Sequence, residues 1–110
     1  MIGILMYFTK FYAEPTGKGE SIFMKAVLIP GDGIGREIAE SVRAVSAALD
    51  TGIEWQEYAA GAEYAAESGE LIAPGALDAI AACGWALKGP TATPIGKGFR
   101  SINVQLRQRF

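Results

Sequence analysis

The 110-residue sequence predicts an α/β fold in which strands and helices alternate as βαβαβ. Two observations support this prediction. Strand-like segments at Ala26–Ile29, Ile53–Tyr58 and Gly84–Lys88 are separated by helix-like segments, an order typical of a layered sheet with parallel strands. The first of them is also apolar at every position, as expected for a strand that is covered on both faces.

The helices between these strands are predicted from the spacing of apolar residues and from end signals. A helix is expected over Glu37–Leu49, because its apolar residues recur at spacings of four, three and four: Ile38, Val42, Val45 and Leu49. Two shorter helices are expected at Ala62–Ser68 and Pro74–Ala82. Proline suits the first position of a helix, where its missing N–H is not needed, and Gly84 suits a helix end.

Residues 1–23 do not share this pattern. Pro15–Gly19 is rich in turn-forming residues, and Met24 opens the first clear strand. We therefore expect residues 1–23 to be an N-terminal extension and residues 24–110 to form the main domain. The alternative is that Ile2–Phe8 forms an extra edge strand of the sheet.

The composition excludes several classes of function. The chain has no histidine, so Ser-His-Asp and Cys-His catalysis cannot occur within it. The net charge is −2 and the ten Lys and Arg residues are scattered, which indicates neither nucleic-acid nor anionic-membrane binding. The longest early apolar run, Ile2–Phe8, is far shorter than the roughly 20 residues that cross a bilayer.

The single cysteine and the opening residues bear on location. Cys83 has no partner for an intrachain disulfide, and its Ala and Trp surroundings indicate a buried, inert thiol in a reducing compartment. Residues 1–23 include Glu14 and Glu20 but no Arg, unlike a mitochondrial transit peptide. A bacterial cytoplasmic location is therefore expected in preference to a mitochondrial one.

A glycine-rich loop, residues Gly31–Gly35, joins the first strand to the first helix. Its Gly-x-Gly-x-Gly spacing misses the dinucleotide pattern G-x-G-x-x-G, because the third glycine comes one residue early. Two interpretations stay open: a phosphate cradle at the helix N-terminus, and a tight turn with no ligand. Asp32 is expected to cap a helix or stabilise the turn, not to act as a catalytic acid.

The segment after the third strand is the most informative, because α/β sheets place ligand-binding groups at the carboxyl ends of their strands. Its glycines and prolines predict an irregular loop, followed by a helix over Ile102–Phe110 with Ser101 as N-cap. On that helix Asn103 and Arg107 form a polar stripe. Beside it lies an apolar stripe of Ile102, Leu106 and Phe110.

An amide and a guanidinium at this spacing suit a carboxylate ligand, to which arginine offers two parallel N–H groups. The alternative is that Asn103 and Arg107 are simply the solvated side of an amphipathic helix. Lys88, Lys97 and Arg100 either help to hold a polyanion or are solubilising surface charges.

Two motifs resemble one protein family. Val27–Ile38 resembles the opening strand, loop and helix of the β-decarboxylating dehydrogenases of isocitrate, isopropylmalate and homoisocitrate. Trp85–Pro94 followed by Ser101–Arg107 resembles the substrate loop of the isocitrate branch of this isocitrate/isopropylmalate dehydrogenase family. The Ser-x-Asn-x-x-x-Arg pattern is the specific part, because isopropylmalate enzymes lack the Ser-x-Asn pair. The resemblance extends from Met24 to Phe110.

The resemblance implies the N-terminal part of this family's fold and a role in the oxidative decarboxylation of isocitrate to 2-oxoglutarate. It implies that Ser101 and Asn103 hydrogen-bond the γ-carboxylate of isocitrate and that Arg107 binds another substrate carboxylate. Thr93, the backbone at Ala92 and again Asn103 would lie near the nicotinamide ribose of NAD or NADP. The resemblance leaves the choice between NAD and NADP open.

The resemblance also implies Mg or Mn and a homodimer for the full-length family. Arg36 departs from the family pattern, which usually has proline there. The chain stops at Phe110, before the family's catalytic Tyr and Lys and its metal-binding aspartates, so we expect no catalytic or metal-binding residue in this chain. We further expect weak cofactor binding and no turnover by the chain alone. The alternatives are a non-catalytic tricarboxylate-binding or interaction domain, and a piece of a related enzyme such as homoisocitrate dehydrogenase.

Overall fold

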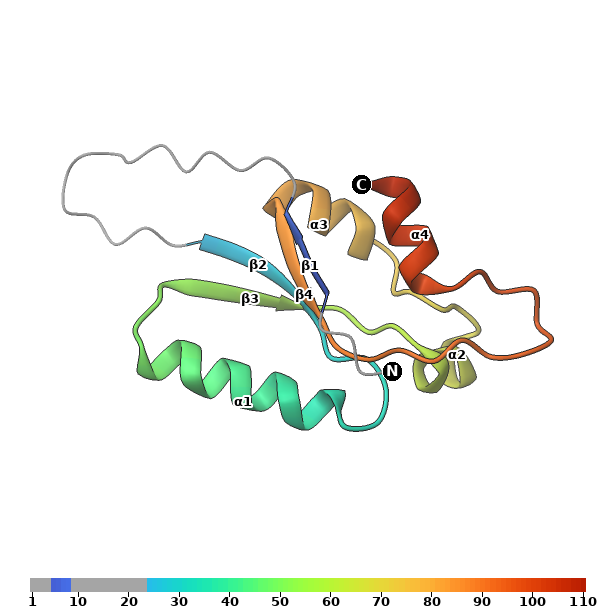
Figure 1. Ribbon diagram of the computed structural model, residues 1–110, viewed down its shortest axis with the longest axis horizontal. Helices are drawn as coiled ribbons and strands as arrows, with labels where there is room; N and C mark the ends of the chain where they lie inside the picture. Colours follow the sequence, from blue (N-terminus) through green and yellow to red (C-terminus); the bar gives the residue numbers. More distant parts are fainter. Residues whose placement is uncertain (1–4, 9–23) are drawn as a thin grey trace.

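The computed structural model describes residues 5–8 and 24–110, which form one four-stranded sheet with four helices (Figure 1). The strands are β1 (Leu5–Phe8), β2 (Met24–Ile29), β3 (Ile53–Glu57) and β4 (Trp85–Lys88). Their order in the sheet is β1-β4-β2-β3. The central strand β2 is parallel to both β3 and β4, so the predicted βαβαβ arrangement is confirmed.

β1 adds to this unit at the free edge of β4. It runs antiparallel to β4, with Leu5 opposite Lys88 and Phe8 opposite Trp85. The strand falls inside Ile2–Phe8 and lies at the edge of the sheet, as the second of the two alternatives for this segment predicts. The turn-rich segment Pro15–Gly19 lies outside the described residues.

The helices are α1 (Gly35–Ala48), α2 (Ala62–Ser68), α3 (Ala76–Cys83) and α4 (Ile102–Arg109). All four were predicted: α2 has the expected bounds, and the other three differ from expectation by one or two residues at an end. The placement of Pro74 at the first helical position was wrong. Gly75, with φ of 81°, turns the chain in the left-handed region before α3 begins at Ala76. Gly84 ends α3 as predicted, again with a positive φ of 86°.

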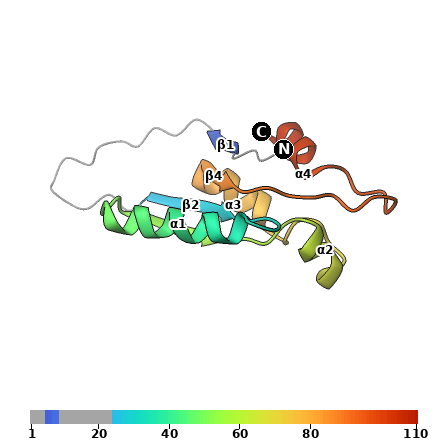
Figure 2. The ribbon, with the colours of Figure 1, turned by 60° about the horizontal axis from the view of Figure 1, so that its bottom comes forward.

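The helices cover the two faces of the sheet unequally. α1 lies on one face, and α3 and α4 lie on the other (Figures 1 and 2). On the α1 face, Trp55 of β3 and Trp85 of β4 meet over the narrow side chain of Ala26, with ring centroids 5.6 Å apart. This ring contact ties the two strands that flank β2.

The apolar stripe predicted on α1 is only partly buried. Val45 is 58% exposed and Leu49 is 70% exposed, and the buried residues of α1 are Gly35, Ala39 and Ser46. Between this stripe and the sheet runs an open groove that includes Trp55 and Trp85. The periodicity therefore predicted the helix correctly, but not the extent of its burial.

The core lies on the opposite face, between the sheet and helices α3 and α4. Its members are buried apolar side chains, among them Val27, Ile29, Ile80, Ile102 and Leu106. Cys83 belongs to this cluster, and burial raises the pKa of its thiol, which agrees with the predicted inert packing role. No helix within the described part of the chain has the length and apolarity needed to cross a membrane.

Candidate functional site

Two loops meet where the parallel strands β2 and β4 end. The Gly31–Gly35 loop follows β2, and residues 89–101 follow β4. The Gly89 N–H donates to the Ile29 carbonyl at 2.7 Å, and the Asp32 N–H donates to the Pro90 carbonyl at 2.7 Å. Carboxyl ends of neighbouring parallel strands are the usual place for ligand-binding groups, so this junction is the candidate site.

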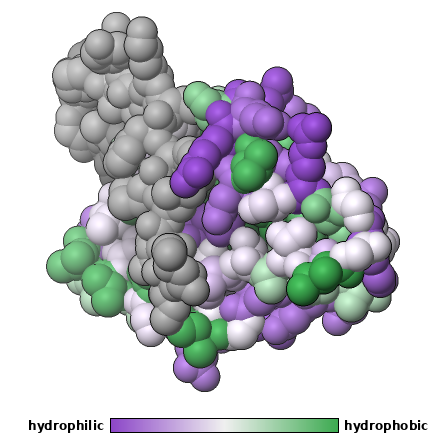
Figure 3. Space-filling model, turned by 45° about the vertical axis from the view of Figure 1, so that its right-hand side comes forward, coloured by the Kyte–Doolittle hydropathy of each residue, from purple (hydrophilic) through white to green (hydrophobic). Residues whose placement is uncertain are grey.

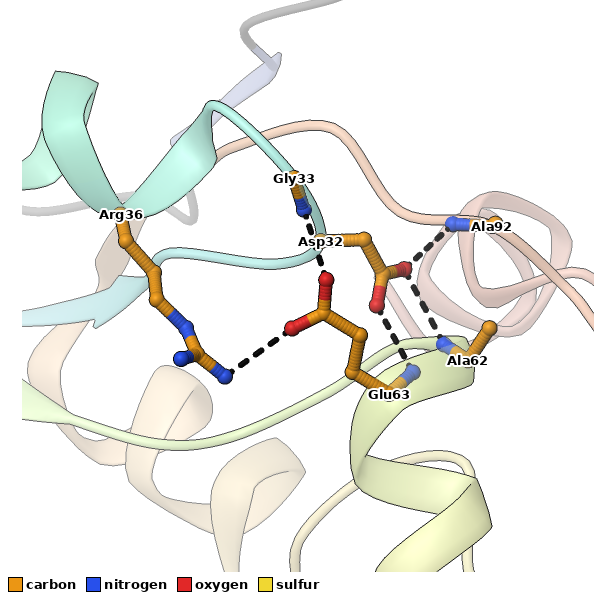
Figure 4. A network of polar contacts seen from close by, with 6 residues as sticks. All are labelled: Asp32, Gly33, Arg36, Ala62, Glu63 and Ala92. Atoms are coloured by element: carbon orange, nitrogen blue, oxygen red, sulfur yellow. Dashed lines mark hydrogen bonds and ion pairs between the residues drawn. The ribbon is translucent and has the colours of Figure 1, made fainter.

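The Asp32 side chain forms the centre of the junction (Figure 4). Its carboxylate accepts three backbone N–H groups: Ala62 at 3.0 Å, Glu63 at 2.9 Å and Ala92 at 2.6 Å. Ala62 and Glu63 are the first residues of α2, whose own N-cap, Gly61, has no side chain to offer. The predicted capping role of Asp32 is therefore confirmed, although it caps α2 and not the helix that follows it directly.

Glu63 makes the reciprocal contact. One of its carboxylate oxygens accepts the Gly33 N–H at 3.1 Å, and the other pairs with the Arg36 guanidinium at 3.0 Å (Figure 4). The N-terminal ends of α1 and α2 are thus each faced by a carboxylate from the other segment, which suits the positive end of the helix dipole. The role of Glu63 was not predicted from the sequence. An acidic residue in the first turn of a helix is common, and its presence does not indicate which distant residue it contacts.

This network decides between the two interpretations of the glycine-rich loop. The amides of Asp32, Gly33 and Gly35 donate to protein acceptors, namely Pro90 O, the Glu63 carboxylate and Asp32 O. A phosphate would need these same amides and would meet two carboxylates at the helix N-termini. The loop is therefore a tight turn that packs chain against chain, and the phosphate-cradle interpretation is wrong.

Lys88, at the end of β4, is buried and only 2% exposed. Its Nζ donates to the Gly89 carbonyl at 2.9 Å. Burial lowers the pKa of Lys88, and the nearby Asp32 carboxylate opposes this shift. The interpretation of Lys88 as a solubilising surface charge is wrong, whereas Lys97 and Arg100 are exposed.

We predict that Lys88→Met stabilises the fold by about 1 kcal/mol at pH 7, because an unbranched apolar side chain replaces a buried charge. The folded-state pKa of Lys88 lies below 10.5, so the unfolded chain binds more protons between the two values. Stability should therefore rise with pH from the folded-state pKa towards 10.5, and the variant should lose this rise.

Urea denaturation at pH 7 and at pH 10 measures both parts of this prediction. The exposed Lys97→Met variant is the matched control and should change neither value. A Lys88→Met variant that is less stable than the original chain at pH 7 would contradict the assigned burial cost.

α4 presents the residues predicted to bind a carboxylate. Ser101 occupies the N-cap position as predicted, but its hydroxyl makes no capping hydrogen bond. Ile102 and Leu106 are 1% exposed and anchor the helix on the core, whereas Phe110 is 39% exposed, so the apolar stripe is one residue shorter than predicted. Asn103 and Arg107 are exposed beside this anchor, and the surface over α4 is mainly hydrophilic (Figure 3).

The other flank of α4 faces a concavity. Gln105 and Arg109 line a space of about 610 Å³ together with Leu77 and Phe99, and Arg109 lies 3.6 Å from Asp78. At 3.6 residues per turn this flank is about 200° around the helix from the Asn103 and Arg107 side chains. The polar stripe predicted from the sequence therefore lies on an open surface and not in this concavity.

The residues predicted near the cofactor start the loop between β4 and α4. Ala92 is exposed and donates its N–H to Asp32, and Thr93 is partly exposed. For a metal ion, the described residues contain no group of three or more His, Cys, Asp or Glu side chains that could hold it. The part of the chain that the structure describes therefore offers no ligand set that fits Mg or Mn.

Comparison with known proteins gives one consistent family. The model of the family described as "Isocitrate/isopropylmalate dehydrogenase" matches residues 25–110. The chain is 43% identical over 95 residues to a chloroplastic 3-isopropylmalate dehydrogenase of Solanum tuberosum, covering 86% of this chain and 27% of that one. It is 47% identical over 87 residues to catalytic subunit 6 of mitochondrial NAD isocitrate dehydrogenase of Arabidopsis thaliana, covering 79% and 23%.

Comparison with solved structures gives the same family. The chain matches the crystal structure of isocitrate dehydrogenase from Methylococcus capsulatus with a TM-score of 0.67 and 42% identity, covering 76% of this chain and 24% of that one. The chain thus spans about a quarter of the length of the curated relatives it matches. Isocitrate dehydrogenases named for NAD and for NADP are both among the relatives.

Proposed function

Because the chain belongs to the isocitrate/isopropylmalate dehydrogenase family, we propose that it forms the substrate-loop segment of an isocitrate dehydrogenase using NAD or NADP. The proposed reaction is the oxidative decarboxylation of isocitrate to 2-oxoglutarate. In this proposal the chain supplies substrate-binding groups and no acid–base residue, and it is inactive alone. A homodimer is proposed for the full-length protein.

The observation that supports isocitrate as the ligand is the polar edge of α4. Asn103 and Arg107 lie on one exposed side of α4, and Ser101 precedes them at the N-cap, off that side, with its hydroxyl unused in capping. A hydroxyl and an amide can both donate to the γ-carboxylate, while the guanidinium can bind a second carboxylate through two N–H groups. The buried Ile102 and Leu106 fix the helix, so these donors are held at a defined spacing.

The proposed cofactor contact is limited to the nicotinamide end. The Thr93 hydroxyl, the backbone at Ala92 and the Asn103 amide are the polar groups offered there. When bound, NAD or NADP accepts a hydride from the substrate carbon that bears the 2-hydroxyl group. These residues would orient the nicotinamide ribose, and the glycine-rich loop would not hold the phosphates because its Asp32, Gly33 and Gly35 amides already donate to protein acceptors.

A second candidate substrate is 3-isopropylmalate, favoured by the 43% identity to the Solanum tuberosum enzyme named for it. It carries an alkyl group where isocitrate carries the γ-carboxylate, so Ser101 and Asn103 would have no partner in it. Homoisocitrate, or tricarboxylate capture without catalysis, would use the same α4 donors.

A titration of the ¹⁵N-labelled chain followed by NMR tests this proposal. We predict that isocitrate shifts the amide signals of Ser101 to Arg107 saturably, with a Kd of about 1 mM. We predict at least about fivefold weaker binding of 3-isopropylmalate, since a site built for a polar group rejects an analogue that lacks it.

The variant Asn103→Ala separates the two candidates. It should weaken isocitrate and leave 3-isopropylmalate unchanged, with the exposed Gln108→Ala as a control on the same helix. Tighter binding of 3-isopropylmalate would favour the second candidate. Shifts with neither ligand would count against a substrate role for these residues.

A further inference from the structure

Asp32 holds the loop that carries the proposed cofactor contact. Its N–H donates to the Pro90 carbonyl at 2.7 Å, and its Oδ2 accepts the Ala92 N–H at 2.6 Å. One residue thus binds positions 90 and 92 through its backbone and its side chain, directly before Thr93. Figure 4 shows the bond from Ala92. Residues 89–101 contain no helix or strand, so contacts of this kind define where the loop lies.

The same carboxylate binds α2. Oδ2 also accepts the Ala62 N–H at 3.0 Å, and Oδ1 accepts the Glu63 N–H at 2.9 Å. Because one oxygen is shared by Ala62 and Ala92, the place of the Ala92 amide depends on where the first turn of α2 sits. Glu63 holds that turn in place through its own bonds to Gly33 and Arg36.

From this geometry we propose that Asp32 is a positioning residue for the nicotinamide-ribose contact at Ala92 and Thr93, and that it couples this contact to the docking of α2. The inference rests on the proposed function, because the cofactor role of these two residues belongs to that proposal. Asp32 touches no ligand itself. It fixes the loop before binding, which reduces the ordering that binding must otherwise impose.

The test uses the ¹⁵N-labelled full chain and the variant Asp32→Asn, which keeps the size of the side chain but replaces one acceptor oxygen by a donor. Losing the negative charge weakens all three hydrogen bonds, and the new NH2 group removes at least one, so amide hydrogen exchange at Ala62, Glu63 and Ala92 should accelerate by up to about tenfold. The β2 amides of Val27 and Leu28 should keep their rates. The matched control is Glu40→Gln on the exposed side of α1, which removes the same charge and should change none of these rates.

Nicotinamide mononucleotide is the probe for the functional part. It should shift the Thr93 amide signal of the original chain, and Asp32→Asn should raise the Kd at least about threefold. If the probe shifts nothing near Thr93 in the original chain, the cofactor part of the proposed function fails, and the positioning role for that contact falls with it. In that case, faster exchange at Ala92 in Asp32→Asn would still show that Asp32 anchors the loop. Only the assignment of the cofactor contact would then be wrong.

Two exchange results overturn the inference by themselves. Unchanged exchange at Ala92 in Asp32→Asn would show that the loop does not depend on this carboxylate. Equal acceleration at Ala92, Val27 and Leu28 would show that Asp32 contributes to general stability and not to the position of the loop.

Discussion

Replacing Gly31 by alanine is expected to destabilise the fold by about 2–5 kcal/mol, a large part of the roughly 5–15 kcal/mol that stabilises an ordinary domain. Gly31 has a φ of 79°, where an L-residue is strained by about 1–2 kcal/mol. A Cβ at this position would lie 2.1 Å from the Pro90 carbonyl oxygen and 2.9 Å from its carbon. The further strain of overpacking, about 1–3 kcal/mol, follows because the obstacle is backbone and not a flexible side chain.

The two backbones cannot simply move apart. Bonds of 2.7 Å on either side, from Gly89 N–H to Ile29 O and from Asp32 N–H to Pro90 O, hold the loops together. Any shift that relieves the clash at Gly31 lengthens these bonds and moves Asp32 away from Ala92. The variant should therefore lose loop position together with stability.

Gly33→Ala is the matched control for Gly31→Ala. Gly33 also has a positive φ, 58°, but a Cβ there meets no atom within 4 Å. It should cost only the backbone strain, about 1 kcal/mol. Urea denaturation monitored by far-UV circular dichroism gives both free energies, and equal losses in the two variants would show that the close approach to Pro90 is not the cause.

Periodicity and end signals predicted the elements of this fold, because those signals are local. The first and last helices were predicted from the spacing of apolar residues, and the end of the helix before β4 from Gly84. What the sequence did not show is what lies opposite each element. The stripe on α1 was correctly placed, but the open groove beside Val45 and Leu49 depends on packing that no local pattern reports.

The candidate site also combines features that local sequence patterns predict with features that depend on distant contacts. The polar stripe of Asn103 and Arg107 follows from helical spacing, and the structure confirms its geometry, while its ligand stays a prediction. The contact of Asp32 with Ala62 and Glu63 joins residues about thirty positions apart, which spacing alone cannot predict. Lys88 was read as a possible surface charge because of its type, although period-two alternation in β4 places it on the same face as the buried Ala86.

The second large effect is expected at Arg107, if isocitrate binds as proposed. Arg107→Ala should weaken isocitrate binding roughly 10- to 100-fold, which corresponds to the loss of one hydrogen-bonded charge contact of about 1.5–3 kcal/mol. The Kd of Arg107→Lys for isocitrate should lie between those of Arg107→Ala and the original chain. Lysine keeps the positive charge but loses the planar contact through two N–H groups. Stability should change by less than about 0.5 kcal/mol, since the side chain is exposed.

Arg109→Ala is the control that separates a specific contact from a general loss of positive charge. Arg109 is two residues further along α4, is also exposed, and lies 3.6 Å from Asp78 on the other flank of the helix. Removing it lowers the net charge by the same amount but should change the NMR-measured Kd for isocitrate less than about twofold, an effect of distant screened charge. Equal weakening by both variants would mean that isocitrate responds to the charge of α4 as a whole. If only Arg107→Ala weakens binding, isocitrate contacts the side of α4 on which Asn103 and Arg107 lie.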